Sequence, residues 1–268
     1  MKITYKIFNS VLVAFIWYFA SVSPLSAQKS EPDNNYGDLS FNFVHQVDGN
    51  PILYDTMIYT NSAGNKYEIN QVQYFISEIV LYSHSVDSIM FSPLIPWHYV
   101  DKDYPNTLIW SPDDKIPAGR YDSISFIFGL SKNNNKSYRF KNPPESIMFW
   151  PDVLGGGYHY MKINVRYHNN NGDISNFNCH LGIGQIRNEQ KKIIGFIHNY
   201  FRVTLPASSF KISKGEISKV EIIMDINKWF GPPDIIDFNN YGGIMDNQEA
   251  MRSICKNGSS AFSCRIIE

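Results

Sequence analysis

The chain has 268 residues and a formal net charge of −1. A chain this close to neutrality offers no field for nucleic acid or for an anionic membrane surface. Hydrophobic residues at 43% and aromatic residues at 15% can build a sizeable core, which excludes a disordered chain.

The first 27 residues are typical of a cleavable signal peptide. Lys2 and Lys6 form a basic start, the apolar stretch 11–22 is short for a bilayer span, and Leu25-Ser26-Ala27 offers a cleavage site. We therefore expect cleavage after Ala27 and a periplasmic or extracellular mature chain. No cysteine stands at the junction, so we expect no lipoprotein anchor, and no later segment is apolar enough to span a membrane.

A polar leader over residues 28–37 precedes a single predicted domain, residues 38–268. In its first strand, Phe41, Phe43 and His45 share one face at a period of two. Further strand-like runs follow at residues 59–83, 97–101, 121–130, 157–167, 177–181, 193–205 and 218–226. Many short strands between turns, with almost no helical period, predict an all-β sandwich of the Greek-key or immunoglobulin-like type.

The C-terminal part carries a helix and two of the three cysteines. Residues 245–258 predict a short helix that Asp246 caps and Asn257-Gly258 ends. Cys255 and Cys264 flank a short turn-rich run, and in an oxidising compartment they are the predicted disulfide pair. Cys179 is left over, and its role stays open.

No enzyme motif stands out. The chain has no G-x-S-x-G, no H-E-x-x-H and no glycine-rich phosphate loop opening a helix, and no pair of acids suits glycoside chemistry. We therefore expect a protein without catalytic activity.

Imidazole and thioether groups are the candidate ligands. His45 lies on an apolar strand face, His159 and Met161 are predicted to point the same way, His180 stands at a strand end, and Met245 follows two glycines. Imidazole suits copper and zinc, and thioether selects Cu(I). Each residue alone is more often part of a hydrogen-bonded core, so both interpretations stay open at this point.

An ordered series of motifs runs through nearly the whole mature chain: FVHQVDGNP from Phe43, YTNSAGNKYEINQVQYFISEIVL from Tyr59, IPAGRY from Ile116, FIFGL from Phe126, MFW from Met148, GY at Gly157, HLG at His180, and Asn257-Gly258 before Phe262. This series resembles the MbnP-like family of extracytoplasmic proteins. The family is named for the copper-binding partner found with methanobactin systems and is common in Bacteroidetes.

The resemblance implies an exported, non-catalytic copper-binding protein with a di-haem peroxidase of the MauG type as its partner. That partner oxidises a tryptophan to kynurenine, and Trp150 is the matching residue here. The usual second tryptophan of the motif is absent, and the segment ending in Gly157-Tyr158-His159 adds a histidine that the usual pattern lacks.

We expect His45, His159 and His180 to bind one copper ion, with Met161 or Met245 as a weaker sulfur ligand. Asp48 and Asp152 are the candidate acceptors that would fix the histidine tautomers. The alternative function is a metal-free β-sandwich that binds carbohydrate or protein through exposed aromatic residues. A neighbouring gene for a di-haem peroxidase would favour the first function, and neighbouring polysaccharide-uptake genes would favour the second.

Overall fold

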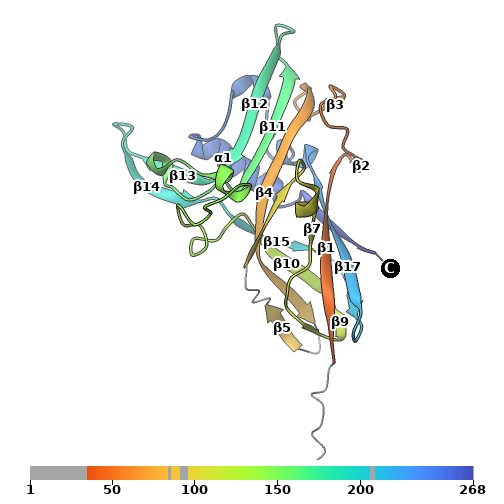
Figure 1. The fold of residues 1–268 in the computed structure, drawn as a ribbon. Helices are drawn as coiled ribbons and strands as arrows, with labels where there is room; N and C mark the ends of the chain where they lie inside the picture. Colours follow the sequence, from red (N-terminus) through yellow and green to blue (C-terminus); the bar gives the residue numbers. More distant parts are fainter. Residues whose placement is uncertain (1–34, 84–85, 91–95, 206–208, 268) are drawn as a thin grey trace, which may run out of the picture. The chain divides into compact units, whose positions relative to one another are not determined.

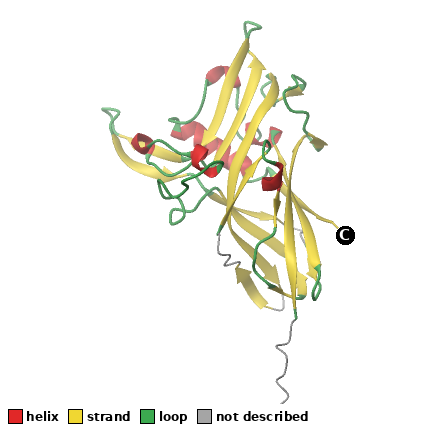
Figure 2. Cartoon of the chain, viewed as in Figure 1, coloured by secondary structure: helices red, strands yellow, loops and turns green. Residues whose placement is uncertain are grey.

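Strands make up most of the regular structure in the computed structural model, which describes residues 35–83, 86–90, 96–205 and 209–267 (Figure 2). The described residues belong to one compact unit. The predicted signal peptide and most of the predicted leader lie outside the described residues. No helix in the described part of the chain is long and apolar enough to cross a membrane.

The first sheet is built on β1 (Tyr36–Val47), which alternates buried and half-buried residues along its length. Its buried side carries Leu39, Phe41 and Phe43, so the period of two places one face of the strand on the core. β1 pairs in parallel with β17 (Ile217–Asp225), and β17 pairs antiparallel with β18 (Phe262–Ile267). The short strands of this sheet are β2 (Asn50–Pro51), β7 (Ile109–Trp110) and β8 (Ile116–Pro117).

The second sheet is organised by the 18-residue strand β4 (Lys66–Ser83) (Figure 1). One half of β4 pairs with β11 (Met161–His168) and the other half with β10 (Ser123–Phe128). β12 (Ile174–Leu181) extends the sheet beyond β11, and β15 (Phe201–Leu205) extends it beyond β10. The remaining strands on β4 are β3 (Tyr59–Thr60), β5 (Val86–Met90) and β6 (Trp97–Asp101).

Two small strand pairs and several helical turns complete the described fold. The pairs are β13 (Ile183–Arg187) with β14 (Ile193–His198), and β9 (Gly119–Tyr121) with β16 (Phe210–Ile212). The α-helix is α1 (Gln248–Gly258), and the 3₁₀ turns are η1 (Pro105–Leu108), η2 (Glu145–Met148), η3 (Asp152–Leu154), η4 (Asn227–Phe230) and η5 (Phe238–Asn240).

Aromatic rings fill the core between the two sheets. Phe128 of β10 lies 5.2 Å from Phe262 of β18 and 5.0 Å from Trp229, measured between ring centroids. Trp229 is fully buried in this core. Trp150 and Tyr158 are also fully buried, and Tyr158 packs against Phe140 with ring centroids 4.5 Å apart. These three aromatic side chains are therefore packing residues and do not form the exposed platform that the alternative function requires.

The all-β prediction with a short C-terminal helix is confirmed, and three local details differ. The run at 193–205 is two strands, because Asn199 is buried and its amide bonds the Gly182 carbonyl at 2.9 Å. β1 begins at Tyr36, inside the predicted leader. Asn247 rather than Asp246 caps α1, with its side chain accepting from the Ala250 amide.

The predicted Cys255–Cys264 bridge stays a prediction, and the structure places the two cysteines on separate elements. Cys255 lies on α1 and donates to the Asn199 carbonyl at 3.3 Å, whereas Cys264 lies in β18 opposite Ile222. Because Cys255 lies on the helix and Cys264 on a strand, their closeness in sequence alone does not determine whether they form a disulfide. Cys179 is a buried residue of β12.

Candidate metal centre

Two of the three predicted histidine ligands lie side by side. The ring centroids of His159 and His180 are 5.1 Å apart, and the planes meet at 83°. His159 precedes β11, and His180 is near the end of β12, so neighbouring strands of the second sheet bring the two rings together (Figure 1). Trp150 lies against this pair.

His159 is fixed by backbone contacts to η2. Its amide donates to the Met148 carbonyl at 2.6 Å, and its ring Nδ1 donates to the same oxygen at 2.9 Å. A carbonyl only accepts, so the proton is on Nδ1 and the lone pair is on Nε2. Nε2 is buried and has no hydrogen-bond partner among the described residues. A buried nitrogen in this state costs free energy unless something else binds it.

His180 is fixed in the complementary way. Its Nε2 lies 2.7 Å from the Asn164 side-chain oxygen, and the Asn164 amide nitrogen donates to Gln71 at 2.7 Å. The bond to Gln71 orients the Asn164 amide, so its oxygen faces His180 and accepts from Nε2. The lone pair of His180 is therefore on Nδ1.

Both rings are neutral at physiological pH. Burial, followed by the charges of Lys162 and His180, lowers the pKa of His159 to about 3. Burial and the Lys162 charge lower the pKa of His180 to about 4. Lys162 lies opposite His180 in the sheet and donates to the Ile147 carbonyl at 2.8 Å. Neutral imidazoles can bind a metal without first losing a proton.

The distance between the two rings allows one shared ion, provided that both lone pairs point at it. With metal–nitrogen bonds of about 2.0 Å, each ring centroid would lie about 3.2 Å from the ion. Two centroids 5.1 Å apart then subtend about 105° at the ion, close to a tetrahedral angle. The described residues contain no group of three or more His, Cys, Asp or Glu that could hold a metal ion. The donor set is therefore two neutral nitrogens, which suits copper and lacks the oxygen ligands that calcium and magnesium require.

Trp150 forms one wall of this centre. Its ring centroid is 4.7 Å from that of His159, at an interplanar angle of 77°. The indole N–H donates to the Leu154 carbonyl at 3.2 Å. Gly182 lies against the ring so closely that a Cβ there would fall 2.5 Å from an indole carbon. The indole is buried and held on more than one side.

The other predicted ligands lie apart from this pair. His45 is buried with both ring nitrogens occupied, Nδ1 by the Tyr54 hydroxyl at 2.9 Å and Nε2 by the Tyr74 hydroxyl at 3.2 Å. Burial lowers its pKa to about 4. Met161 is fully buried on the core face of β11, opposite to the face of Lys162. Met245 packs on the edge of the core.

The expectation that His159 and Met161 point the same way is wrong. β11 begins only at Met161. Tyr160, the residue before it, is outside the strand, although its amide donates to the Leu181 carbonyl. The alternation of a strand therefore does not extend back to His159. Its ring lies next to His180, whose register opposite Lys162 puts it on the outer face of the sheet.

The predicted acceptors Asp48 and Asp152 are engaged elsewhere. Asp48 accepts from Asn227 at 2.9 Å, and Asp152 accepts from Ser137 and Tyr138. The Met148 carbonyl and the Asn164 amide fix the two tautomers instead. A sequence does not show that a backbone carbonyl will accept a hydrogen bond. Asn164 could have been predicted, because it lies two residues after Lys162 and therefore on the same face of the strand.

His98 is a further histidine, and its ring is enclosed by aromatic side chains. Its ring is stacked between Phe43 at 5.3 Å and Trp110 at 4.9 Å, and Nε2 donates to the Thr107 carbonyl at 2.7 Å. Burial lowers its pKa to about 4. Both faces of the ring are covered and its Nε2 is held by that carbonyl, so His98 serves as a packing residue.

The fold and the centre together define an all-β protein with a buried pair of neutral histidines beside a tryptophan. The MbnP family model matches residues 36–248, so the chain belongs to the MbnP family. Among solved structures, MbnP from Methylosinus trichosporium is similar with a TM-score of 0.57 at 14% identity, covering 87% of this chain and 99% of that chain. At this identity the structural match shows the fold alone. A search of the curated proteins found no match.

Proposed function

We propose that the protein binds one copper ion between Nε2 of His159 and Nδ1 of His180. The observation that carries the proposal is the buried Nε2 of His159, which finds no hydrogen-bond partner among the residues that the structure describes, although Nδ1 is well held. Metal-binding histidines commonly donate the other ring N–H to a carbonyl or an amide oxygen, as both histidines do here. Membership of the MbnP family supports copper as the ion.

The proposed ion is monovalent. The two ligands are neutral, the site is largely buried, and the charge of Lys162, which acts on both rings, is positive. A buried charge that is not compensated costs free energy, and the cost grows with the charge. Cu(I) therefore fits this environment better than Cu(II) or Zn(II). His45 is left out of the ligand set because two tyrosines already occupy its ring nitrogens.

The proposed location is outside the cytoplasm, and the proposed mature chain begins at Gln28. The protein itself is not a catalyst in this proposal; the copper centre and Trp150 are what a partner would act on. That partner is a di-haem peroxidase of the MauG type, which would convert Trp150 to kynurenine. The position of the indole 4.7 Å from His159 supports Trp150 as the target, because a change in the indole would alter the wall of the copper site.

Copper titration tests the site. The mature chain is titrated with Cu(I) against a chromogenic Cu(I) chelator, alongside His159→Leu, His180→Leu and the control His168→Leu. His168 is an exposed histidine of β11, so it matches the two ligands in residue type and in strand pair. We expect one ion per chain for the wild type and the control, and none for the other two variants. Unchanged stoichiometry and affinity in both ligand variants would refute the site.

Mass spectrometry tests the modification. We expect the tryptic peptide that carries Trp150 to have the mass of the kynurenine form when the protein is isolated from cells that contain its native partner. The same peptide from a host without the partner should be unmodified. Unmodified tryptophan in the first sample would remove Trp150 as the target and would leave the copper site to be judged by the titration.

A further inference from the structure

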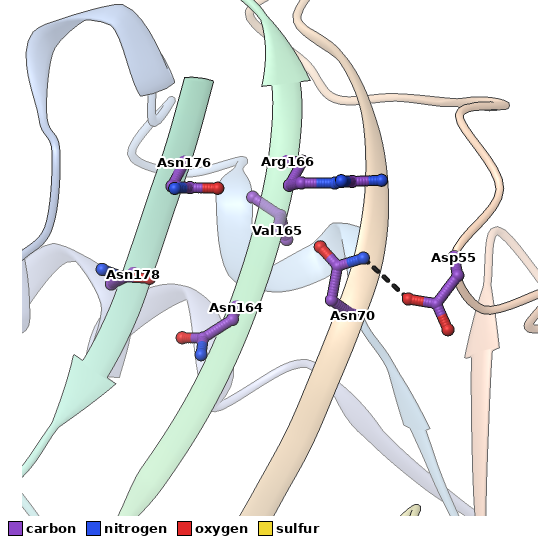
Figure 3. Close-up of a pocket in the computed structure, with 7 residues that line it drawn as sticks. All are labelled: Asp55, Asn70, Asn164, Val165, Arg166, Asn176 and Asn178. Atoms are coloured by element: carbon purple, nitrogen blue, oxygen red, sulfur yellow. Dashed lines mark hydrogen bonds between the residues drawn. The ribbon is translucent and has the colours of Figure 1, made fainter. Parts of the chain in front are cut away.

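A polar hollow of about 430 Å³ lies on the outer face of the second sheet, across β4, β11 and β12 (Figure 3). Asn70 projects into it from β4, Asn164 and Arg166 from β11, and Asn176 and Asn178 from β12. In the sheet register Asn176 lies opposite Arg166, and Asn178 lies opposite Asn164. Asp55, from the segment before β3, closes the side next to Asn70.

Several polar groups in this hollow have no hydrogen-bond partner in the described part of the chain. The side-chain amides of Asn176 and Asn178 are exposed and form no hydrogen bond with another described residue. Asp55 uses one carboxylate oxygen to accept from Asn70 at 2.7 Å, which leaves the other oxygen available. Each primary amide offers two N–H donors and one acceptor oxygen, so the hollow presents donors and acceptors together.

We propose that this hollow binds an extended peptide through the peptide's backbone. Asn176 and Asn178 are two residues apart on one face of β12, which separates them by about 6.8 Å along the strand. An extended ligand has the same two-residue repeat, so every second residue of the ligand would place its backbone N–H and C=O next to one of these side-chain amides. The carbonyl and the NH₂ of each Asn side chain match the N–H and C=O of one ligand residue.

The charges in the hollow select the kind of peptide. Arg166 donates to Glu68 at 2.6 Å, and this ion pair compensates its charge, so the hollow has no excess positive charge to favour a phosphate or a sulfate. None of the residues that line the described hollow is aromatic, so a sugar ring would find no stacking surface. The remaining charge is the Asp55 carboxylate. It complements a basic side chain or a free amino terminus at that end of the peptide.

This inference goes beyond the copper site and does not depend on it. The two sites share one residue, since the Asn164 oxygen that accepts from His180 belongs to a side chain that also lines the hollow. Loss of copper binding in the titration above would leave the peptide site untouched.

Nuclear magnetic resonance of the side-chain NH₂ groups tests the proposal on the ¹⁵N-labelled mature chain. The probe is the peptide Lys-Ala-Ala-Ala-Ala-Ala with an amidated carboxyl end, and the comparison probes are cellotetraose and inorganic phosphate. The double variant Asn176→Ala, Asn178→Ala removes the unpaired amides. The control is Asn171→Ala, which changes an exposed residue of the same type in the turn between β11 and β12.

We expect saturable shifts of the Asn70, Asn176 and Asn178 amides with the peptide. The dissociation constant should be about tenfold weaker in the double variant and unchanged in the control. Absence of saturable shifts up to about 10 mM peptide, in the affinity range of the weakest specific complexes, would overturn the proposal. Saturable shifts with cellotetraose or phosphate alone would overturn it as well and would assign the hollow to that ligand. Equal weakening in the control would also count against it.

Discussion

The unpaired nitrogen of His159 leads to an unusual expectation about stability. Replacing a buried histidine normally destabilises a fold, because its hydrogen bonds are lost. In metal-free protein, we expect His159→Leu to keep or slightly increase the free energy of unfolding. His45→Leu, at an equally buried histidine, should decrease it. Leucine is close to histidine in volume, so packing changes are small in both variants.

The magnitudes follow from the partners of each ring. His159→Leu removes an unpaired nitrogen that costs about 1–3 kcal/mol and one hydrogen bond that contributes about 0.5–1.5 kcal/mol. The Met148 carbonyl keeps its bond to the backbone amide of residue 159 at 2.6 Å, so it is not left unpaired. His45→Leu removes two hydrogen bonds and leaves the hydroxyl of the fully buried Tyr74 without its histidine partner, at a cost of about 2–4 kcal/mol.

Urea denaturation at pH 7.5 with a copper chelator present measures both variants against the wild type. The His159 variant should lie within about 1 kcal/mol of the wild type or above it, and the His45 variant should lie at least about 2 kcal/mol below. If His159→Leu destabilises as strongly as His45→Leu, then His159 is a paired structural residue. In that case the main support for the copper site is lost.

Three further expectations can be measured on the same protein. The pKa values of His45 and His98 are lowered to about 4, against about 6.5 unfolded, so the unfolded chain binds more protons between these values. The free energy of unfolding should therefore fall as the pH decreases from about 6.5 to about 4, by up to roughly 3 kcal/mol per histidine, and a flat urea-titration profile would contradict this. Gly182→Ala would press a Cβ into the indole and should lower the melting temperature, whereas Gly119→Ala, with nothing within 4 Å, should not. Asn164→Ala should weaken Cu(I) binding about 10-fold to 100-fold, and an unchanged affinity would show that this amide does not orient the ligand.

The sequence predicts the strands well where the pattern is local. Alternation from Phe41 to Val47 gives β1 and its buried face correctly, because a strand with one face on the core must repeat at a period of two. The parallel pairing of β1 with β17 was not predictable in this way. It joins Asp38 to Ile217 and Gln46 to Asp225, and no local pattern specifies a partner so far along the chain.

The family resemblance is confirmed. Two of the three histidines proposed as ligands are neighbours in space, and the copper site itself stays a proposal. His45 was correctly placed on a buried face. Its hydrogen-bond partners are the hydroxyls of Tyr54 and Tyr74, which a hydrophobic pattern does not predict. His159 was assigned to a strand that begins two residues later, so its direction was wrong.

The segment that departs from the usual family pattern is the one that builds the proposed ligand. Gly155, Gly156 and Gly157 all have positive φ, a conformation that other residues adopt with strain. A Cβ on Gly157 would fall 2.4 Å from the Asn135 side chain, whose oxygen accepts from the Tyr158 amide. The three glycines thus let the chain turn back after Trp150 and place His159 against the Met148 carbonyl and the indole. If this centre binds copper, the glycine run and the added histidine are one feature, since neither would position the unpaired nitrogen without the other.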